Sequence, residues 1–438
     1  MTKPTLLVLL SVIGLLFSCS NQFKDVPHPG RGDAGKGPKP FGKHSNQVIL
    51  DWNLMALEAM GGPTYVHSNL GARLNAMTHL AMHDALNAIA PVYATYALQS
   101  RDEKADPIAA AASAAHTVLL AAFPDKQTSL DSALTQSLRK VPDGDAETRG
   151  VALGKLAGQA IVSLRQHDGA TENPFVPIGP STGPGVYGAV PPFDIIFAPF
   201  WKNMQPFSLQ IPSQFRPAPQ PALNSETYAI DFAEVKSIGE KNSPTRTADQ
   251  TAYAKFWYEY SEIGWNRVTR VAAADKKLDL LSTARLFALV NMSLVDSYTA
   301  GWDAKFHYNF WRPLTAIRAA ETDGNPATAP DAQWEPLMAT PPVQDYPSTH
   351  SALGSAAATV LSALVGDKTR FTLASTTADP VDATRSFTSF SQAAAENADS
   401  RVVAGIHFRF SCMAGLELGR KVGEWTVAKH LRPLSPVR

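Results

Sequence analysis

Apolar residues recur every three to four positions along two long stretches of the chain, which is the spacing of an α-helix with one buried face. In the first stretch, which is rich in Ala and Leu, this spacing predicts helices over residues 49–60, 70–89, 107–122, 126–138 and 146–167. Asp106 and Pro107 suit the start of the third of these helices, because proline tolerates the first helical position. Strand patterns are few and short, so the fold is predicted to be mainly α.

The second helical stretch begins near Thr247 and continues almost to the end of the sequence. There the periodicity predicts helices over residues 248–260, 276–307, 313–320, 348–365, 387–403 and 406–431. Residues 168–223, between the two stretches, instead hold many prolines, glycines and aromatic residues with little periodicity. We expect this Pro-rich loop to wrap the helical body. Two alternatives stay open for it, a cover over a functional site and a purely structural role.

The N-terminus has the pattern of a bacterial lipoprotein signal. A short apolar run over residues 6–17 leads into Leu16-Phe17-Ser18-Cys19, and it is shorter than the ~20 apolar residues that span a bilayer. We therefore expect removal of residues 1–18 and lipidation of Cys19, which would anchor an exported protein in the periplasm or at the outer membrane.

The remaining chain divides by composition into three parts. Residues 19–45 are rich in Gly, Pro and Lys and are predicted to form a flexible tether. An N-terminal helical region with the Pro-rich loop is predicted over residues 46–245, and a helical catalytic domain over residues 246–438.

Composition and cysteine content exclude some classes of function. Of the 438 residues, 45% are hydrophobic and 18% are charged, which is typical of a globular protein. The formal net charge is zero and no long basic run exists, so nucleic acid is not expected as a partner. Cys412 is the only cysteine besides Cys19, so the mature chain can form neither an internal disulfide nor a cysteine zinc cluster. We expect Cys412 to be a small buried residue, although it stands close to the motifs described next.

Three separated segments carry residues that suit the binding of a tetrahedral oxyanion. They contain Lys305 with Arg312, then residues 347–350 (Pro-Ser-Thr-His), then Arg401 with His407. Lys and Arg side chains neutralise oxyanion oxygens through charge-assisted hydrogen bonds. An imidazole can bond to the central atom or move protons. The three segments together therefore indicate an enzyme that handles phosphate or vanadate.

The first two segments are expected to meet through helix geometry. Lys305 and Arg312 are about two helical turns apart, so both can point along one helix face. Their aromatic neighbours predict burial, and buried cations need an anionic partner. Ser348 is predicted to be the N-cap of a helix whose N–H groups face the same anion. His350 in the first turn should have a lowered pKa, because it lies at the positive end of the helix dipole.

The third segment needs a break in its helix. Arg401 and His407 are six residues apart and do not share one face of a regular helix. We expect a break near Gly405 that lets the two side chains converge, with His407 opening the last helix.

The three segments resemble the motifs of the superfamily that joins vanadium-dependent haloperoxidases and type 2 phosphatidic acid phosphatases. Residues 305–313 fit its pattern K-x6-R-P. Residues 347–350 fit P-S-G-H except at Thr349, and residues 400–411 fit S-R-x5-H-x3-D except at Ser411. The flanking sequences are similar to the haloperoxidase members of the superfamily over residues 81–89, 308–318 and 405–410.

The resemblance implies helical bundles and a vanadate-dependent haloperoxidase that oxidises a halide with hydrogen peroxide. In that family the oxygens of orthovanadate would be held by Lys305, Arg312, Ser348, Thr349 and Arg401. His407 would bond to vanadium, and His350 would be the acid–base catalyst. Bromide and iodide are favoured over chloride because they are easier to oxidise. Phosphate could occupy the same site, and a small organic acceptor is a further expected partner.

The two departures from the motifs have chemical consequences. Thr349 places a β-branched side chain where glycine permits free approach of the backbone to the anion. Ser411 can accept a hydrogen bond from His407 but supplies no charge, whereas a carboxylate would raise the basicity of the imidazole. The serine is therefore expected to leave His407 a poorer nucleophile.

Two other functions remain as alternatives. One is a phosphomonoesterase of the same superfamily, in which His407 attacks phosphorus and His350 protonates the leaving group. The predicted weakness of His407 argues against it. The other is a lipoprotein that stores or senses oxyanions without turnover, which the presence of two histidines disfavours.

Four further residues are candidates for a role in the site. Trp302 lies one turn before Lys305, and the resemblance places it beside the halide, whereas aromatic core packing is its commoner role. His79 and His83 have the spacing of metal ligands on a helix, but no third ligand is near, so a packing or helix-dipole role is favoured. His307 is expected to support the residues that contact the anion.

Overall fold

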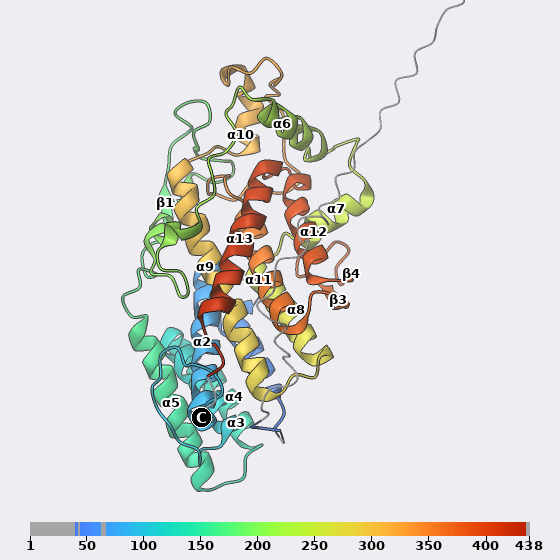
Figure 1. The fold of residues 1–438 in the computed structure, drawn as a ribbon. Coiled ribbons are helices and arrows are strands. Elements are labelled where there is room, and N and C mark those ends of the chain that lie inside the picture. The colour runs from blue at the N-terminus through green and yellow to red at the C-terminus, as the bar shows by residue number, and fades with distance from the viewer. Residues whose placement is uncertain (1–39, 43, 63–66, 435–438) are drawn as a thin grey trace, which may run out of the picture.

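The computed structural model describes residues 40–42, 44–62 and 67–434. They form an elongated, mainly helical body with two short two-stranded sheets (Figure 1). The prediction of a mainly α fold is confirmed. The expected signal peptide, Cys19 and most of the expected tether lie outside the described residues. Within the described part of the chain, no helix is both long and apolar enough to pass through a lipid bilayer.

The first helical region matches the periodicity of the sequence closely. Its helices are α1 (Gln47–Ala59), α2 (Ser68–Ile89), α3 (Pro107–Ala122), α4 (Gln127–Leu138) and α5 (Asp145–Leu164). Asp106 caps α3 as expected, since its carboxylate accepts the backbone N–H groups of Ile108 at 2.8 Å and Ala109 at 2.9 Å. Helices α3 and α5 pack closely because Gly154 has no Cβ, which would lie 2.3 Å from the Ala110 carbonyl oxygen. Helix α2 is buried along nearly its whole length and forms the centre of this region.

The Pro-rich loop wraps the helical body as predicted. It contains the antiparallel strands β1 (Phe175–Pro177) and β2 (Ile195–Phe197) and the 3-10 turns η4 (Pro199–Asn203) and η5 (Pro212–Phe215). Buried Asp296 of α9 (Leu280–Tyr308) accepts the backbone N–H groups of Phe207 at 2.7 Å, Ser208 at 2.6 Å and Leu209 at 2.9 Å. These bonds tie the loop to α9, the longest described helix.

The second helical region surrounds α9. Its other elements are α6 (Glu226–Ile238), α7 (Ala248–Phe256), α8 (Ser261–Asp275), α10 (Pro313–Arg318), η6 (Ala320–Thr322), α11 (Thr349–Val365), β3 (Phe371–Ala374), β4 (Thr384–Phe387), α12 (Phe390–Val403) and α13 (Arg409–Lys429). Helix α9 packs against α2 on one side and against α11 and α13 on the other (Figure 1). One cluster of buried hydrophobic residues extends from Phe41 to Leu431, so the two helical regions share a core.

The sequence analysis missed two of the described helices, α6 and α8. No helix was predicted at the position of α6. The single helix predicted over residues 248–260 ends at Phe256, and the separate helix α8 begins after it. Helix α8 buries Glu262 and Asn266, which bond to other buried polar groups, the Tyr298 hydroxyl at 2.9 Å and the Asn291 side chain at 2.8 Å. Because part of its buried face is polar, α8 lacks the apolar periodicity that identifies a helix in a sequence.

Candidate functional site

Lys305 and Arg312 reach the same short segment from different elements. Lys305 lies near the end of α9, but Arg312 lies beyond that end as the N-cap of α10, so the expectation of one shared helix face is wrong. Lys305 Nζ donates to the carbonyl oxygens of Gln344 at 2.5 Å and Asp345 at 3.0 Å. Arg312 Nε donates to the carbonyl oxygen of Val343 at 2.6 Å. Both cations are buried, as predicted, and carbonyl acceptors rather than helix spacing bring them together.

The second motif forms the start of α11. Ser348 is its N-cap, as predicted, and its hydroxyl oxygen accepts the Ser351 hydroxyl at 2.9 Å. Thr349 follows in the first turn, with its side chain against Gly301 of α9. A Cβ at Gly301 would lie 3.0 Å from Thr349 Cγ2. The absence of a side chain at residue 301 therefore leaves room for the β-branched residue that replaces the motif glycine.

His350 is oriented by the loop between α7 and α8. Its Nε2 lies 3.1 Å from the backbone carbonyl oxygen of Glu259. A carbonyl can only accept, so Nε2 carries the proton and Nδ1 keeps the lone pair in the neutral ring. The Glu259 carboxylate in turn accepts Arg267 Nη1 at 2.8 Å and the Thr376 hydroxyl and N–H at 2.8 and 3.0 Å. The loop that carries the His350 acceptor is thus held from two sides.

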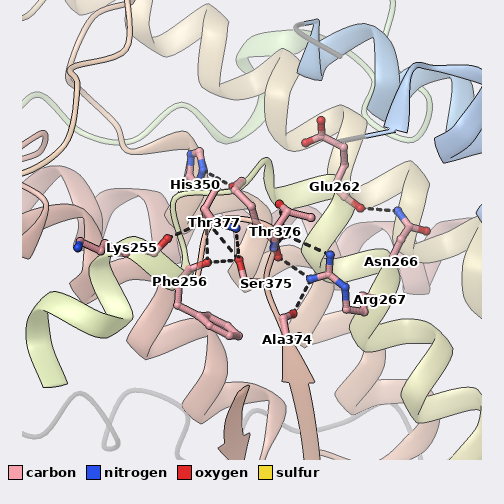
Figure 2. Close-up of polar contacts among 11 residues, drawn as sticks. Lys255, Phe256, Glu262, Asn266, Arg267, His350, Ala374, Ser375, Thr376 and Thr377 are labelled. Carbon is pink, nitrogen blue, oxygen red and sulfur yellow. Dashed lines mark hydrogen bonds and ion pairs between the residues drawn. The ribbon is translucent and has the colours of Figure 1, made fainter. Parts of the chain in front are cut away.

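The segment that follows β3 also bonds to the end of α7, from which this loop starts (Figure 2). Ser375 Oγ donates to the carbonyl oxygen of Phe256 at 2.6 Å, and Thr377 Oγ1 donates to that of Lys255 at 2.7 Å. Arg267 also donates to the Ala374 carbonyl at 2.7 Å, as Figure 2 shows. The position of His350 therefore depends on a polar network far from its own motif.

The third motif bends back through glycine. Gly405 has a φ of +78°, and a Cβ there would lie 2.3 Å from the Gly239 carbonyl oxygen, so the predicted break at this residue is confirmed. Helix α13 begins only at Arg409, which means that His407 precedes the last helix and does not open it. The break places His407 Nε2 3.0 Å from Arg312 Nη1, so the first and third motifs meet.

A carboxylate that the sequence analysis missed faces His407. His407 Nδ1 and Asp345 Oδ1 are 2.9 Å apart, although the two atoms are out of line for a conventional hydrogen bond and neither has another partner among the described residues. The Ser411 hydroxyl donates to the other carboxylate oxygen, Oδ2. The expectation that Ser411 accepts a hydrogen bond from His407 is therefore wrong, and Asp345 supplies the charge beside this imidazole that Ser411 does not. Asp345 lies two residues before Pro347, outside every motif, so only its place in this buried segment could have suggested it.

Buried positive charge exceeds buried negative charge in the site. Burial lowers the pKa of Lys305 well below its usual value and that of Arg401 to about 10, which reflects the free-energy cost of these unsolvated cations. Burial raises the pKa of Asp345 to about 6, against the opposing effect of Arg312. Burial and then the nearby arginines lower the pKa of His350 well below its usual value. The predicted direction is confirmed, although burial rather than the helix dipole is the main cause.

Arg401 has hydrogen-bonding capacity left for an anion. Its Nη1 donates to the Trp257 carbonyl at 2.6 Å, but its buried Nε and Nη2 have no partner among the described residues. No group of three or more His, Cys, Asp or Glu side chains in the described part of the chain could hold a metal cation. The donor set therefore fits an oxyanion such as vanadate or phosphate, and not a bare metal ion.

The site opens into a cavity of about 710 Å³. Thr349, His350 and His407 line it with the two arginines, whereas Lys305 and Ser348 are not among the residues of its wall. Aromatic residues form the outer wall: Phe175, Phe193 and Phe197 from the Pro-rich loop, Tyr258 from the loop between α7 and α8, and Tyr298 and Trp302 from α9. The loop thus covers part of the candidate site, which favours the first of its two predicted roles.

The remaining candidates have different outcomes. Trp302 lines the cavity, where its Nε1 donates to the Phe197 carbonyl at 3.2 Å. His79 and His83 are buried among polar side chains, with His79 Nε2 2.9 Å from Asn53 Nδ2 and stacked on Phe287, so the packing interpretation is confirmed. His307 is exposed on the surface, so its expected support of the anion site is wrong. Cys412 is buried, as predicted, and burial raises the pKa of its thiol to about 12.

Comparisons with known proteins agree with this geometry. Residues 285–436 match the family model of the VCPO second helical-bundle domain, which includes all three motifs. The chain is 28% identical over 405 residues to the vanadium chloroperoxidase of Curvularia inaequalis. That match covers 72% of this chain and 65% of the relative, so the chain spans about two thirds of that protein's length.

Solved structures share the fold at low sequence identity. A bacterial vanadium-dependent iodoperoxidase superposes with a TM-score of 0.77 at 24% identity, over 90% of this chain and 98% of that one. The apo form of a bacterial vanadium-dependent chloroperoxidase superposes with a TM-score of 0.66 at 18% identity, over 82% of this chain and 93% of that one. These likenesses establish the helical-bundle architecture.

Proposed function

We propose, from the premise that this chain belongs to the vanadium haloperoxidase family, that it is a vanadate-dependent enzyme that oxidises a halide with hydrogen peroxide. The overall reaction takes H₂O₂, X⁻ and H⁺ to HOX and H₂O. One observation carries the proposal. Arg401, which lines the cavity together with Arg312, His350 and His407, has two buried donors, Nε and Nη2, without a partner among the described residues.

Several residues are suited to hold the anion. Arg401 and Arg312 supply guanidinium donors, and Thr349 lies in the first turn of α11, where backbone N–H groups are free. Lys305 and Ser348 remain predicted contributors, although in the structure they bond to other protein groups. His407 keeps the lone pair of Nε2 on the side of Arg312, where it could bond to a metal oxyanion.

The protein's own groups supply the proton transfers. Bound vanadate would act as a Lewis acid that polarises peroxide toward attack by the halide. His350, which burial keeps neutral, holds the lone pair of Nδ1 free to take a proton from hydrogen peroxide and to return it to the hydroxide that departs as water. The arginines offset the negative charge that develops on the oxygens.

The proposed substrates are a halide and a small organic acceptor. Iodide and bromide are the proposed halides, since they are the easier to oxidise, and the iodoperoxidase likeness is consistent with this choice. Trp302 is proposed to lie beside the halide, because it lines the cavity next to the first motif. A small organic acceptor is a further proposed partner, for which the aromatic outer wall offers an apolar surface.

Titration of the metal-free protein with orthovanadate tests the function. We expect peroxide-dependent oxidation of iodide and bromide to rise with vanadate and to disappear in His407→Ala. The His307→Ala variant, which removes an exposed histidine outside the site, is the matched control. Halide oxidation that is independent of vanadate, or that persists in His407→Ala, would rule the proposal out.

A phosphomonoesterase remains the second candidate, because the carboxylate that faces His407 is the kind of partner that a nucleophilic histidine uses. Its test is hydrolysis of p-nitrophenyl phosphate by the metal-free protein. Hydrolysis without any vanadate-stimulated halide turnover would make this the main activity. Vanadate-stimulated halide turnover without hydrolysis would exclude it.

For the location of the protein, we propose export and lipid anchoring at Cys19. The support is the sequence of residues 6–19, all of which lie outside the described residues. Radiolabelled palmitate should be incorporated by the wild-type protein in bacterial cells and not by Cys19→Ser. Labelling of both proteins, or of neither, would count against the anchor.

A further inference from the structure

The proton positions on His407 follow from its two neighbours. Arg312 has only donors, so its Nη1, 3.0 Å from His407 Nε2, requires Nε2 to be the acceptor with a lone pair. The proton of the neutral ring must then reside on Nδ1. That nitrogen faces Asp345 Oδ1 at 2.9 Å and has no other partner among the described residues.

Asp345 is itself held in place from several directions. Its side chain is fully buried, and Oδ2 accepts the hydroxyl of Ser411. Its backbone N–H donates to the Phe310 carbonyl at 3.0 Å, and its carbonyl accepts Lys305 at 3.0 Å. A carboxylate fixed at this many points has little freedom to turn away from the imidazole.

We infer that Asp345 is the positioning residue of His407 and that it replaces the acid which the third motif lacks at residue 411. The carboxylate and the hydroxyl have exchanged places relative to the motif. Ser411 fixes the acid, and Asp345, from the second segment, faces the imidazole. This arrangement selects the tautomer whose Nε2 can bond to a metal oxyanion, and it raises the basicity of that nitrogen.

The inference rests on the proposed function only in the choice of vanadate as a probe. A simpler role for Asp345 would be to balance the charges of buried Lys305 and Arg312. The two roles differ in how they treat different anions. If Asp345 only balances charge or supports the fold, its loss should change the affinity for all oxyanions alike. If it positions His407, its loss should weaken only the binding of an anion that bonds to Nε2. Vanadate can accept such a bond without peroxide or halide, and inorganic phosphate without a leaving group does not form one.

The first experiment compares the dissociation constants of orthovanadate and inorganic phosphate for the metal-free protein by calorimetry. In Asp345→Asn we expect vanadate to bind roughly 10- to 100-fold more weakly, the usual cost of losing such a partner of a metal-bound histidine. Phosphate should bind as tightly as before or more tightly, because a negative charge beside three cations has been removed. Equal weakening of both anions, or no change in either, would overturn the inference.

A matched variant controls for the loss of a buried carboxylate. Asp296→Asn removes the acid that ties the Pro-rich loop to α9, away from His407. It should lower the unfolding temperature without changing the ratio of vanadate to phosphate affinity. A changed ratio in Asp296→Asn would show that the ratio does not report on His407, and the positioning role would lose its support.

The exchange of residues offers a rescue test. Asp345→Ser alone should lose vanadate affinity, and the double variant Asp345→Ser/Ser411→Asp should regain at least part of it, because it restores an acid at the motif position. In parallel, ¹⁵N NMR of histidine-labelled, metal-free protein should show the His407 ring protonated at Nδ1 in the wild type and a mixture of tautomers in Asp345→Ser. An unchanged tautomer and an absent rescue would together refute the role of Asp345. Halide oxidation by the wild type, measured separately, tests the proposed function, so each idea can fail without the other.

Discussion

Arg165 and Arg401 are equally buried arginines in different regions of the molecule, and they differ in how many of their side-chain nitrogens have a hydrogen-bond acceptor. Arg165, at the end of α5, donates to the Asp168 carboxylate and to two carbonyls of the Pro-rich loop, and it lies 3.8 Å from the centre of the Phe207 ring. Arg401 makes one bond to a carbonyl, and its Nε and Nη2 have no partner among the described residues. A buried cation whose donors are all used stabilises the fold, whereas one with unused donors indicates a ligand.

The largest expected effect tests the structural side of this comparison. Arg165→Ala should lower the free energy of unfolding by about 3–5 kcal/mol, because it leaves the buried Asp168 with one cation fewer and two carbonyls unpaired. Guanidinium unfolding measures this loss. Protein that remains folded should keep its affinity for vanadate, and a variant as stable as the wild type would contradict the comparison.

The next effect tests the functional side. Arg401→Ala should lower kcat/KM for iodide oxidation by roughly 10²–10³-fold at saturating vanadate, the usual cost of one donor to a developing oxyanion. The free energy of unfolding should change by less than about 1 kcal/mol or even rise, because a poorly paired buried charge has been removed. Steady-state kinetics and guanidinium unfolding on the same sample give both numbers. A large loss of stability would make Arg401 a structural residue like Arg165.

The pH dependence of the unfolding free energy tests the structural side of the comparison again, through the buried His79. Burial lowers the pKa of His79 from 6.5 to about 3. Below pH 6.5 the unfolded chain binds a proton that folded His79 does not, so stability is full above that pH and falls as the pH drops toward 3. The slope from this residue should approach about 1.4 kcal/mol per pH unit. Unfolding free energies measured between pH 4 and pH 7 should therefore depend less on pH in His79→Asn, and identical slopes would contradict a neutral buried His79.

The smallest expected effect concerns Thr349 and Gly301. Gly301→Ala should weaken vanadate binding, since the new methyl group would lie 3.0 Å from Thr349 Cγ2 and push that residue toward the anion. Thr349→Gly should relieve this effect, with a coupling energy of about 1 kcal/mol in a double-mutant cycle. Additive effects of the two substitutions would show that the contact does not influence the site.

Much of the site could be predicted because local chemistry determines it. The N-cap role of Ser348 and the break at Gly405 depend on residues next to them in the chain. The burial of Lys305 and Arg312 was evident from their aromatic neighbours. How the two side chains come together could not be predicted. Helix α9 ends between them, and both donate to carbonyl groups that are distant in the sequence.

The sequence by itself determined the helical character, the order of the motifs and the residue types that suit an oxyanion, since periodicity, caps and glycine breaks are local properties. Only the tertiary structure decided which groups stand behind the two imidazoles. The Glu259 carbonyl reaches His350, and the Asp345 carboxylate reaches His407, from segments that no motif links to them. Such contacts depend on how helices pack, and a buried polar group can be satisfied by any partner that packing brings within reach.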